Sequence, residues 1–224
     1  ALKPEEKMHS WEGAFSETVF VYGAALDWAF ECKWPIQVFS LGLGLGYNEI
    51  MTAAFCLNRG VSNWRCLSFE SDPWLIEQFK SWIYEEPSEL TQAYDEILRR
   101  MSEHQQVDSR EVRVCLQNGL DQNRLVLESA YTMDFDLARF GVTVCFYDAF
   151  SEKVSPLLWT EEILNKTILG LAPGAVFATY AAKGRLNRAL KANGFSIQER
   201  SGFGKKKQST LAIRTGLSAG SIDP

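Results

Sequence analysis

The sequence contains only two histidines, His9 and His104, and its five cysteines show no Cys-x-x-Cys spacing. Two imidazoles are too few for a multi-histidine metal centre or a catalysis built on histidine relays. The thiols lie mostly in apolar stretches and indicate neither a zinc site nor a disulfide framework. We therefore expect no bound metal and reduced, buried cysteines.

Long apolar runs are also missing. No stretch approaches the roughly 20 residues that a membrane-spanning helix needs, and the start, residues 1–7, lacks the apolar centre of a secretory signal. We expect a cytoplasmic protein without a membrane partner.

An excess of basic residues is missing as well, because 23 lysines and arginines face 28 aspartates and glutamates, for a net charge of −5. This balance argues against a protein that coats nucleic acid through its overall field. Basic residues do gather near the end of the chain, at Arg185, Arg188, Lys191, Arg200 and Lys205 to Lys207. They are compatible with a local phosphate-binding patch or with an ordinary solvated surface.

The length and the hydrophobic content of 46% fit one domain with a large core. We expect a single domain over residues 1–214 and a small, polar, disordered tail over residues 215–224. Within the domain, predicted strands alternate with predicted helices. The strands are 36–41, 64–69, 112–116, 142–147 and 175–180, and the helices are about 23–30, 47–58, 73–84, 88–103, 160–169 and 184–192.

This alternation predicts an α/β fold with a doubly wound, mostly parallel sheet. Two further strand-like runs, 195–200 and 209–214, flank a glycine-containing segment and predict an antiparallel pair near the C-terminus.

Three alternating glycines, Gly42, Gly44 and Gly46, follow the first predicted strand. Glycines allow a tight turn into a helix and a close approach of backbone to a ligand. The third glycine of a dinucleotide fingerprint would fall on Tyr47, which weakens a nicotinamide or flavin interpretation. S-adenosylmethionine has no pyrophosphate, so this spacing favours it, and a tight turn without a ligand is the alternative.

Polar side chains follow other predicted strands. Glu70 comes after the second, where a carboxylate can accept hydrogen bonds from both ribose hydroxyls of an adenosyl group. Asp72 precedes Pro73 and fits better as a helix N-cap. Asn118 and Asp121 come after the predicted strand 112–116, and either is a candidate for contacting the adenine.

The apolar run 144–147 delivers Asp148 to a strand end, where an open α/β sheet builds its active site. A carboxylate there can orient a neutral amine toward the methyl group of a sulfonium donor. Phe150 and Trp159 can stack on a base extruded from RNA, with ordinary core packing as the alternative.

Together these residues resemble the methyltransferase unit of the enzyme that makes 5-methylaminomethyl-2-thiouridine at the tRNA wobble position. The segments that carry the resemblance are Asp148-Ala-Phe-Ser-Glu152 through Pro156 to Thr160, Leu171 to Gly174, Ala178 to Tyr180, Arg188 to Leu190, Gly194-Phe195, Gly202 to Lys206, and the glycine loop with Asn48.

The resemblance implies a class I S-adenosylmethionine-dependent methyltransferase fold and methyl transfer to the aminomethyl nitrogen of a wobble uridine. It implies Asp148 as the active-site aspartate, Asn48 beside the cofactor, and Lys205 and Lys206 on the tRNA side. A separate flavin-dependent oxidase would supply the amine, because the methyltransferase unit accounts for the 224 residues.

The chain also departs from the family pattern. In register from Asp148, the family's lysine falls on Val154, with Lys153 one place early, its proline on Glu152 and its asparagine on Ser155. In the glycine loop, Leu43 and Leu45 replace the usual residues. Two alternatives stay open, the first because of these departures and the second because of the net negative charge. One is a catalytically inactive tRNA-binding module, and the other is a small-molecule amine methyltransferase or aminopropyltransferase on the same fold.

Overall fold

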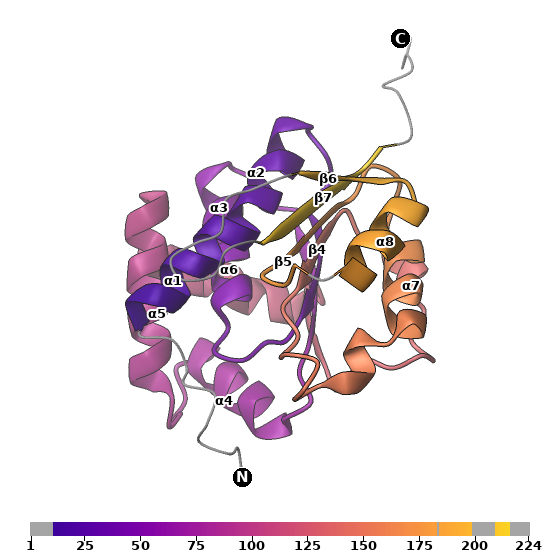
Figure 1. Ribbon diagram of the computed structural model, residues 1–224. Coiled ribbons are helices and arrows are strands. Elements are labelled where there is room, and N and C mark those ends of the chain that lie inside the picture. Colours follow the sequence, from indigo (N-terminus) through magenta and orange to yellow (C-terminus); the bar gives the residue numbers. More distant parts are fainter. Residues whose placement is uncertain (1–10, 183, 199–208, 216–224) are drawn as a thin grey trace.

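The computed structural model describes residues 11–182, 184–198 and 209–215. A seven-stranded sheet runs through the middle of the molecule in the order β3-β2-β1-β4-β5-β7-β6 (Figure 1). Its strands are β1 (Gln37–Leu41), β2 (Arg65–Phe69), β3 (Leu125–Glu128), β4 (Val144–Tyr147), β5 (Val176–Thr179), β6 (Phe195–Gln198) and β7 (Thr210–Arg214).

The pairs formed by β1 to β5 are all parallel, whereas β7 runs antiparallel to both β5 and β6. The predicted α/β fold with an antiparallel C-terminal pair is thereby confirmed. Strand order reverses at β1, whose last residue, Leu41, pairs with Tyr147 at the end of β4. In open α/β sheets, ligands bind beyond the carboxyl ends of the strands at such a switch point.

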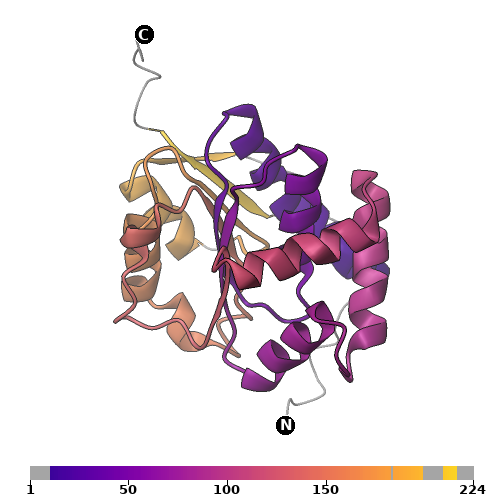
Figure 2. The ribbon, with the colours of Figure 1, turned by 180° about the vertical axis from the view of Figure 1, so that it is seen from behind.

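Helices cover both faces of the sheet. They are α1 (Trp11–Thr18), α2 (Ala24–Glu31), α3 (Tyr47–Asn58), α4 (Pro73–Ile83), α5 (Thr91–Gln105), α6 (Ser109–Asp121), α7 (Glu161–Leu169) and α8 (Gly184–Ala192). Viewed from either side, α7 and α8 lie on one face, and α1 to α3 with α5 and α6 lie on the other (Figures 1 and 2). Each face has its own buried hydrophobic cluster against the sheet.

The segment between α1 and α2 is a short π-helix, η1 (Val19–Gly23). It contacts β5 and α3, and it buries Tyr22 against the ring of Phe146 in β4. The sequence predicts only the helix that follows it, near 23–30, which corresponds to α2. Single π-helical turns occur often at functional sites.

The predicted strand at 112–116 is wrong. These residues lie inside α6, where Asp108 caps the helix by accepting hydrogen bonds from the backbone N–H groups of Arg110 and Glu111. Val112 and Leu116 are buried four positions apart, which is helical spacing. The third strand is instead β3, a four-residue strand that the sequence analysis missed.

The other predicted elements are confirmed within a few residues. Asp72 is the N-cap of α4, with its side chain accepting from the backbone N–H of Trp74. The predicted strand 195–200 corresponds to β6, and its last two positions lie outside the described residues. Two 3-10 turns, η2 (Leu137–Phe140) and η3 (Pro156–Trp159), flank β4. Over the described ranges, no helix has both the length and the apolar composition required to cross a membrane.

Candidate active site

The bend after β1 consists of three glycines in the left-handed region, with φ of 102° at Gly42, 50° at Gly44 and 68° at Gly46. A Cβ on Gly42 would lie 2.8 Å from the carbonyl oxygen of Asp148, and one on Gly46 would lie 2.4 Å from the ring of Phe79. A Cβ on Gly44 would meet nothing within 4 Å. The outer two glycines therefore allow close packing inside the protein, while the middle one borders open space.

Glu70 follows β2 and lies beside this bend. Its Oε2 accepts a hydrogen bond of 3.0 Å from the backbone N–H of Gly44, and its Oε1 accepts one of 3.0 Å from the backbone N–H of Asp72. The residue is 8% exposed. Because a carboxylate oxygen can accept more than one hydrogen bond, both oxygens keep capacity for hydroxyl donors of a ligand.

Asp148 follows β4 on the other side of the bend. Its Oδ1 accepts a hydrogen bond of 2.6 Å from the hydroxyl of Tyr22, and its Oδ2 accepts one of 3.1 Å from the side-chain amide of Asn48. Asn48 lies in the first turn of α3, immediately after the glycines. Asp148 is thus held by two donors from elements that are far apart in the sequence.

Tyr22 stays protonated as a donor in this arrangement. Burial, chiefly, and then the charge of Asp148 raise the pKa of the Tyr22 phenol well above its ordinary value, and a backbone hydrogen bond from Tyr180 opposes that rise. Tyr180 in turn donates from its own hydroxyl to the carbonyl of Ala149 at 2.6 Å. These contacts fix the start of the loop after β4.

Residues 85–215 match the family model described as S-adenosyl-L-methionine-dependent methyltransferase. The chain belongs to this family. The methyltransferase is also 43% identical over 74 residues to the tRNA 5-methylaminomethyl-2-thiouridine biosynthesis bifunctional protein MnmC of Caulobacter sp. (strain K31), an alignment that covers 33% of this chain and 12% of that protein. The matching protein of Idiomarina loihiensis is 25% identical over 213 residues, which cover 88% of this chain and 34% of that protein.

Among solved structures, the crystal structure of MNMC2 from Aquifex aeolicus resembles the methyltransferase with a TM-score of 0.51 and 22% sequence identity. The likeness covers 81% of this chain and 54% of that chain, and it supports the fold. The chain spans about a third of the length of the Idiomarina protein. The segment aligned with the Caulobacter protein covers a smaller share of that protein's length. These matches confirm the family resemblance inferred from the sequence.

The residues at the bend fit S-adenosylmethionine, the cofactor of this family. Gly44 leaves its outer side open, and Glu70 presents a carboxylate where ribose hydroxyls can donate. Asn48 has a buried Oδ1 with no hydrogen-bond partner among the described residues. A buried acceptor without a donor is costly in a folded protein, and a polar ligand group would supply the missing donor. Gly44, Asn48 and Glu70 therefore stay candidates for contacting the cofactor. Gly42 and Gly46 shape the bend from inside the protein, and their contact with the cofactor stays a prediction.

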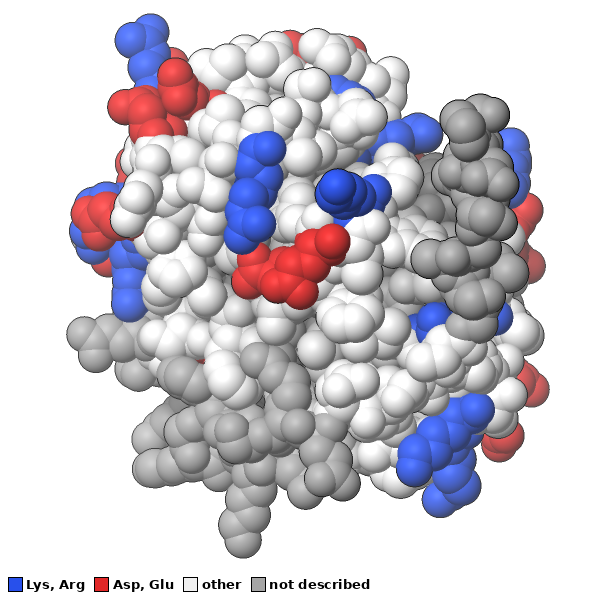
Figure 3. Space-filling view, turned by 90° about the horizontal axis from the view of Figure 1, so that it is seen from above, with Lys and Arg blue, Asp and Glu red and all other residues white. Residues whose placement is uncertain are grey.

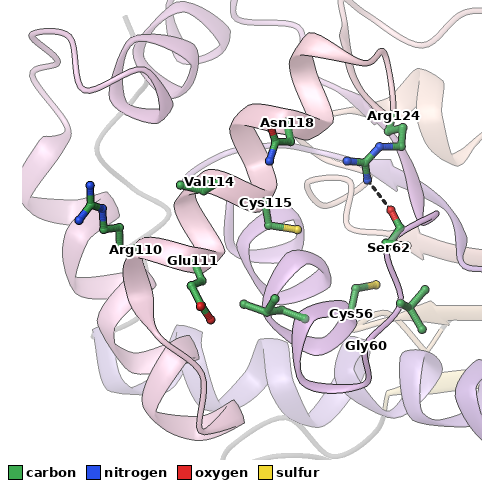
Figure 4. Close-up of a pocket in the computed structure, with 11 residues that line it drawn as sticks. Cys56, Gly60, Ser62, Arg110, Glu111, Val114, Cys115, Asn118 and Arg124 are labelled. Carbon is green, nitrogen blue, oxygen red and sulfur yellow. Dashed lines mark hydrogen bonds between the residues drawn. The ribbon is translucent and has the colours of Figure 1, made fainter.

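Asn118 and Asp121 are not brought to this site. Both lie in α6, because the strand that was expected to precede them is part of that helix. Asp121 accepts a hydrogen bond of 2.6 Å from Tyr84, and Asn118 lines a cavity of about 560 Å³ between α3 and α6 (Figure 4). The same cavity is lined by Ser62, which precedes β2, so Asn118 lies near the amino ends of the strands and away from the bend. Their proposed adenine contact is wrong.

The two aromatic substrate candidates, Phe150 and Trp159, differ in exposure to solvent. Phe150 is 54% exposed, two residues beyond Asp148, and remains able to stack on a substrate. Trp159 is 1% exposed and packs edge-on against Tyr147, so its predicted stacking role is wrong. It instead donates from its indole nitrogen to the carbonyl of Phe150 at 2.6 Å, which fixes the loop. Lys205 and Lys206 lie outside the described residues.

Tyr22 is the site residue that sequence reasoning missed. It lies 126 positions before the carboxylate that it contacts, in an apolar segment with no motif of its own. Its role depends on how η1 crosses the end of β4, and no local spacing encodes that contact.

Proposed function

We propose that this methyltransferase transfers a methyl group from S-adenosylmethionine to the aminomethyl nitrogen of a modified wobble uridine in tRNA. The observation that carries the proposal is the Asp148 carboxylate, held by Tyr22 and Asn48 next to the glycine bend. The names of the relatives in Caulobacter and Idiomarina support the choice of nucleoside.

The role of Asp148 follows from its contacts. Two donors favour the ionised carboxylate, which can accept a hydrogen bond from an incoming amine and hold the nitrogen lone pair in one direction. S-adenosylmethionine, which Gly44, Asn48 and Glu70 would hold, would supply an electrophilic methyl group. The amine nitrogen oriented by Asp148 would form the new carbon–nitrogen bond as the carbon–sulfur bond breaks, and would then lose a proton to water. Since the donor is already activated, orientation accounts for most of what the protein must contribute.

The direct test uses labelled S-adenosylmethionine with tRNA that carries the aminomethyl precursor, and the same tRNA lacking it as the acceptor control. We expect labelling of the first only, and a loss of about a hundredfold or more in Asp148→Asn, which keeps the shape of the side chain. Asp121→Asn is the matched control, because Asp121 also accepts from a tyrosine at 2.6 Å but lies away from the site. Equal labelling by the two variants would remove Asp148 from the mechanism.

The proposal includes an upstream partner. A methyltransferase cannot itself create the primary amine that it methylates, so a separate flavin-dependent oxidase is proposed to supply it. Mass spectrometry of wobble nucleosides from cells that lack this protein tests the order of the two steps. Accumulation of the unmethylated amine is expected, and unchanged wobble nucleosides would contradict it.

The side of the molecule that would face tRNA is proposed to be the one bearing Asp148 and Phe150. Figure 3 views the opposite end, where the described lysines and arginines are separated by uncharged and acidic residues and form no continuous basic surface. Lys205 and Lys206 remain candidates for phosphate contacts. Binding to tRNA that weakens steeply with salt is expected.

One observation favours a small-molecule amine as a second candidate acceptor. The loop after β4 exposes Phe150, Val154 and Leu157, and its Glu152 is paired with Arg185 at 3.3 Å. An apolar rim in which the one acidic side chain of residues 150–157 is paired suits a small aromatic amine. Methyl transfer to such an amine, together with tRNA binding that is insensitive to salt, would favour this candidate.

The other alternative is an inactive tRNA-binding module. In calorimetry, such a module would bind tRNA but would not bind S-adenosylmethionine.

A further inference from the structure

The contact between Tyr22 and Asp148 joins two parts of the chain that the sequence does not connect. The hydroxyl of Tyr22 lies 2.6 Å from Oδ1, and the tyrosine is 2% exposed, with its ring packed at 5.3 Å from that of Phe146. A short bond to a charged acceptor is stronger than one between neutral groups. Tyr22 therefore holds the Asp148 carboxylate by a hydrogen bond in addition to packing beneath the site.

The direction of this hydrogen bond is fixed by a second contact. The backbone of Tyr180, just beyond β5, donates to the Tyr22 hydroxyl oxygen, so the hydroxyl proton is left to point at Asp148. Asn48 faces the other carboxylate oxygen with its amide nitrogen. The carboxylate is consequently fixed in rotation by donors on both of its oxygens.

We propose that Tyr22 is a positioning residue for methyl transfer, holding the Asp148 carboxylate in one orientation toward the acceptor amine. This inference rests on the proposed function, because it acts through Asp148. The π-helix supplies the reason that Tyr22 can do this. A π-helical turn contains an additional residue and shifts the side-chain direction relative to the α-helices on either side.

Other titratable groups also face Asp148 and must be kept constant in a test. Glu49 of α3 lies close enough for its charge to interact with that of Asp148, and Tyr180 donates to the neighbouring carbonyl of Ala149. Neither group is altered by a change at Tyr22 that preserves the ring. The substitution Tyr22→Phe therefore isolates the hydroxyl.

The experiment compares Tyr22→Phe with Tyr84→Phe. Tyr84 also donates to an aspartate at 2.6 Å, but to Asp121 at the opposite end of the sheet. We expect Tyr22→Phe to lower kcat between about tenfold and about a hundredfold, since a small misplacement of a reacting group has an effect of that order. The dissociation constant of S-adenosylmethionine should not change. Tyr84→Phe should match the wild type, and equal kcat values for all three proteins would overturn the inference.

A second measurement needs neither cofactor nor acceptor. Carbon-13 NMR of aspartate-labelled protein follows the titration of the Asp148 carboxyl, assigned with Asp148→Asn. The midpoint should move upward in Tyr22→Phe because a donor to the ionised form is lost. It should move downward with 3-fluorotyrosine at position 22, which is a stronger donor in the same space. Midpoints that do not follow this order would overturn the inference, even if Tyr22→Phe folds poorly.

The two proposals fail in different ways. If the wild-type protein transfers no methyl group to the aminomethyl tRNA, the proposed acceptor is wrong, while the NMR titration still tests the contact. If the wild type is active and Tyr22→Phe leaves both kcat and the titration unchanged, Tyr22 is structural and the proposed function stands.

Discussion

The backbone N–H of Gly44 donates a hydrogen bond of 3.0 Å to Oε2 of Glu70, a residue 26 positions later in the chain. This bond connects the bend after β1 to the end of β2, two elements that pair in parallel within the sheet. One carboxylate therefore both shapes the glycine bend and borders the space outside it. Changes at Glu70 and at Gly44 should affect cofactor binding by separable routes.

Replacing Glu70 by glutamine should weaken S-adenosylmethionine binding by about tenfold to a hundredfold, measured by calorimetry. The variant keeps the size of the side chain but loses the charge that strengthens hydrogen bonds from hydroxyl donors. Glu31→Gln is the control, because Glu31 is exposed at the end of α2, ahead of the amino end of β1. Equal affinities in the two variants would exclude Glu70 from the cofactor site.

Replacing Gly44 by alanine should weaken the cofactor while costing little packing. Gly60 offers a matched control, since it too has a positive φ, 66°, and a Cβ there would meet nothing within 4 Å. Both alanine variants should lose about 1 kcal/mol of folding free energy to backbone strain, seen in urea unfolding. Only Gly44→Ala should also raise the dissociation constant of S-adenosylmethionine. A similar rise in Gly60→Ala would mean that strain alone accounts for the loss.

Sequence alone predicted that several residues of the candidate site lie together at strand ends. Gly42 to Gly46, Glu70 and Asp148 each follow a short apolar strand, and parallel strands bring such ends to one edge. The strand that failed was 112–116, because Val-Arg-Val-Cys-Leu alternates like a strand although Asp108 caps a helix ahead of it. Because of that error, Asn118 and Asp121 were predicted to lie at the carboxyl ends of the strands, whereas both lie in α6.

The contacts around Asp148 show a second limit. The local sequence predicts the position of the Asp148 carboxylate. Its contact with Tyr22 depends on how η1 packs against the end of β4, which residue spacing does not predict. The predicted stacking role of Trp159 was wrong for a related reason. The sequence does not tell whether an aromatic side chain near a site is exposed or buried. The indole N–H of Trp159 donates to the backbone carbonyl of Phe150, so the ring can be buried without an unsatisfied donor.

Replacing Phe150 by alanine should raise KM for the acceptor about tenfold and leave the affinity for S-adenosylmethionine unchanged. Phe150 is exposed beside Asp148, and stacking of a base on an aromatic ring contributes roughly 1–3 kcal/mol. Leu169→Ala is the control, because Leu169 is an exposed apolar residue at the end of α7. If both variants keep the wild-type KM in steady-state kinetics, Phe150 does not contact the acceptor.

Replacing Val154 by lysine should strengthen tRNA binding, because it restores the cation that the family pattern has at this position. Val154 is exposed, so the longer side chain can reach solvent without disturbing the core. The gain should be greatest at low salt and fade as salt rises, which filter binding over a salt series would show. Val154→Gln controls for side-chain length alone. An equal gain with glutamine would mean that charge is not involved.

Glu49 predicts a pH dependence of stability that is separate from catalysis. It is 0% exposed beneath the bend, and Ser68 donates to its Oε1 at 2.7 Å, while Oε2 has no hydrogen-bond partner among the described residues. Burial is the main cause that raises its pKa from 4.5 to about 7. Between these two values the folded state binds a proton that the unfolded state has lost, so the free energy of unfolding falls as pH rises through this window.

Replacing Glu49 by glutamine should remove this decline. The two proteins should unfold in urea with similar free energies near pH 4.5, and Glu49→Gln should be the more stable by roughly 3 kcal/mol above pH 7, where the buried carboxylate is charged. Glu111→Gln, an exposed change in α6, should follow the wild-type curve. Parallel curves for the wild type and Glu49→Gln from pH 5 to pH 8 would mean that Glu49 does not change its protonation in this range.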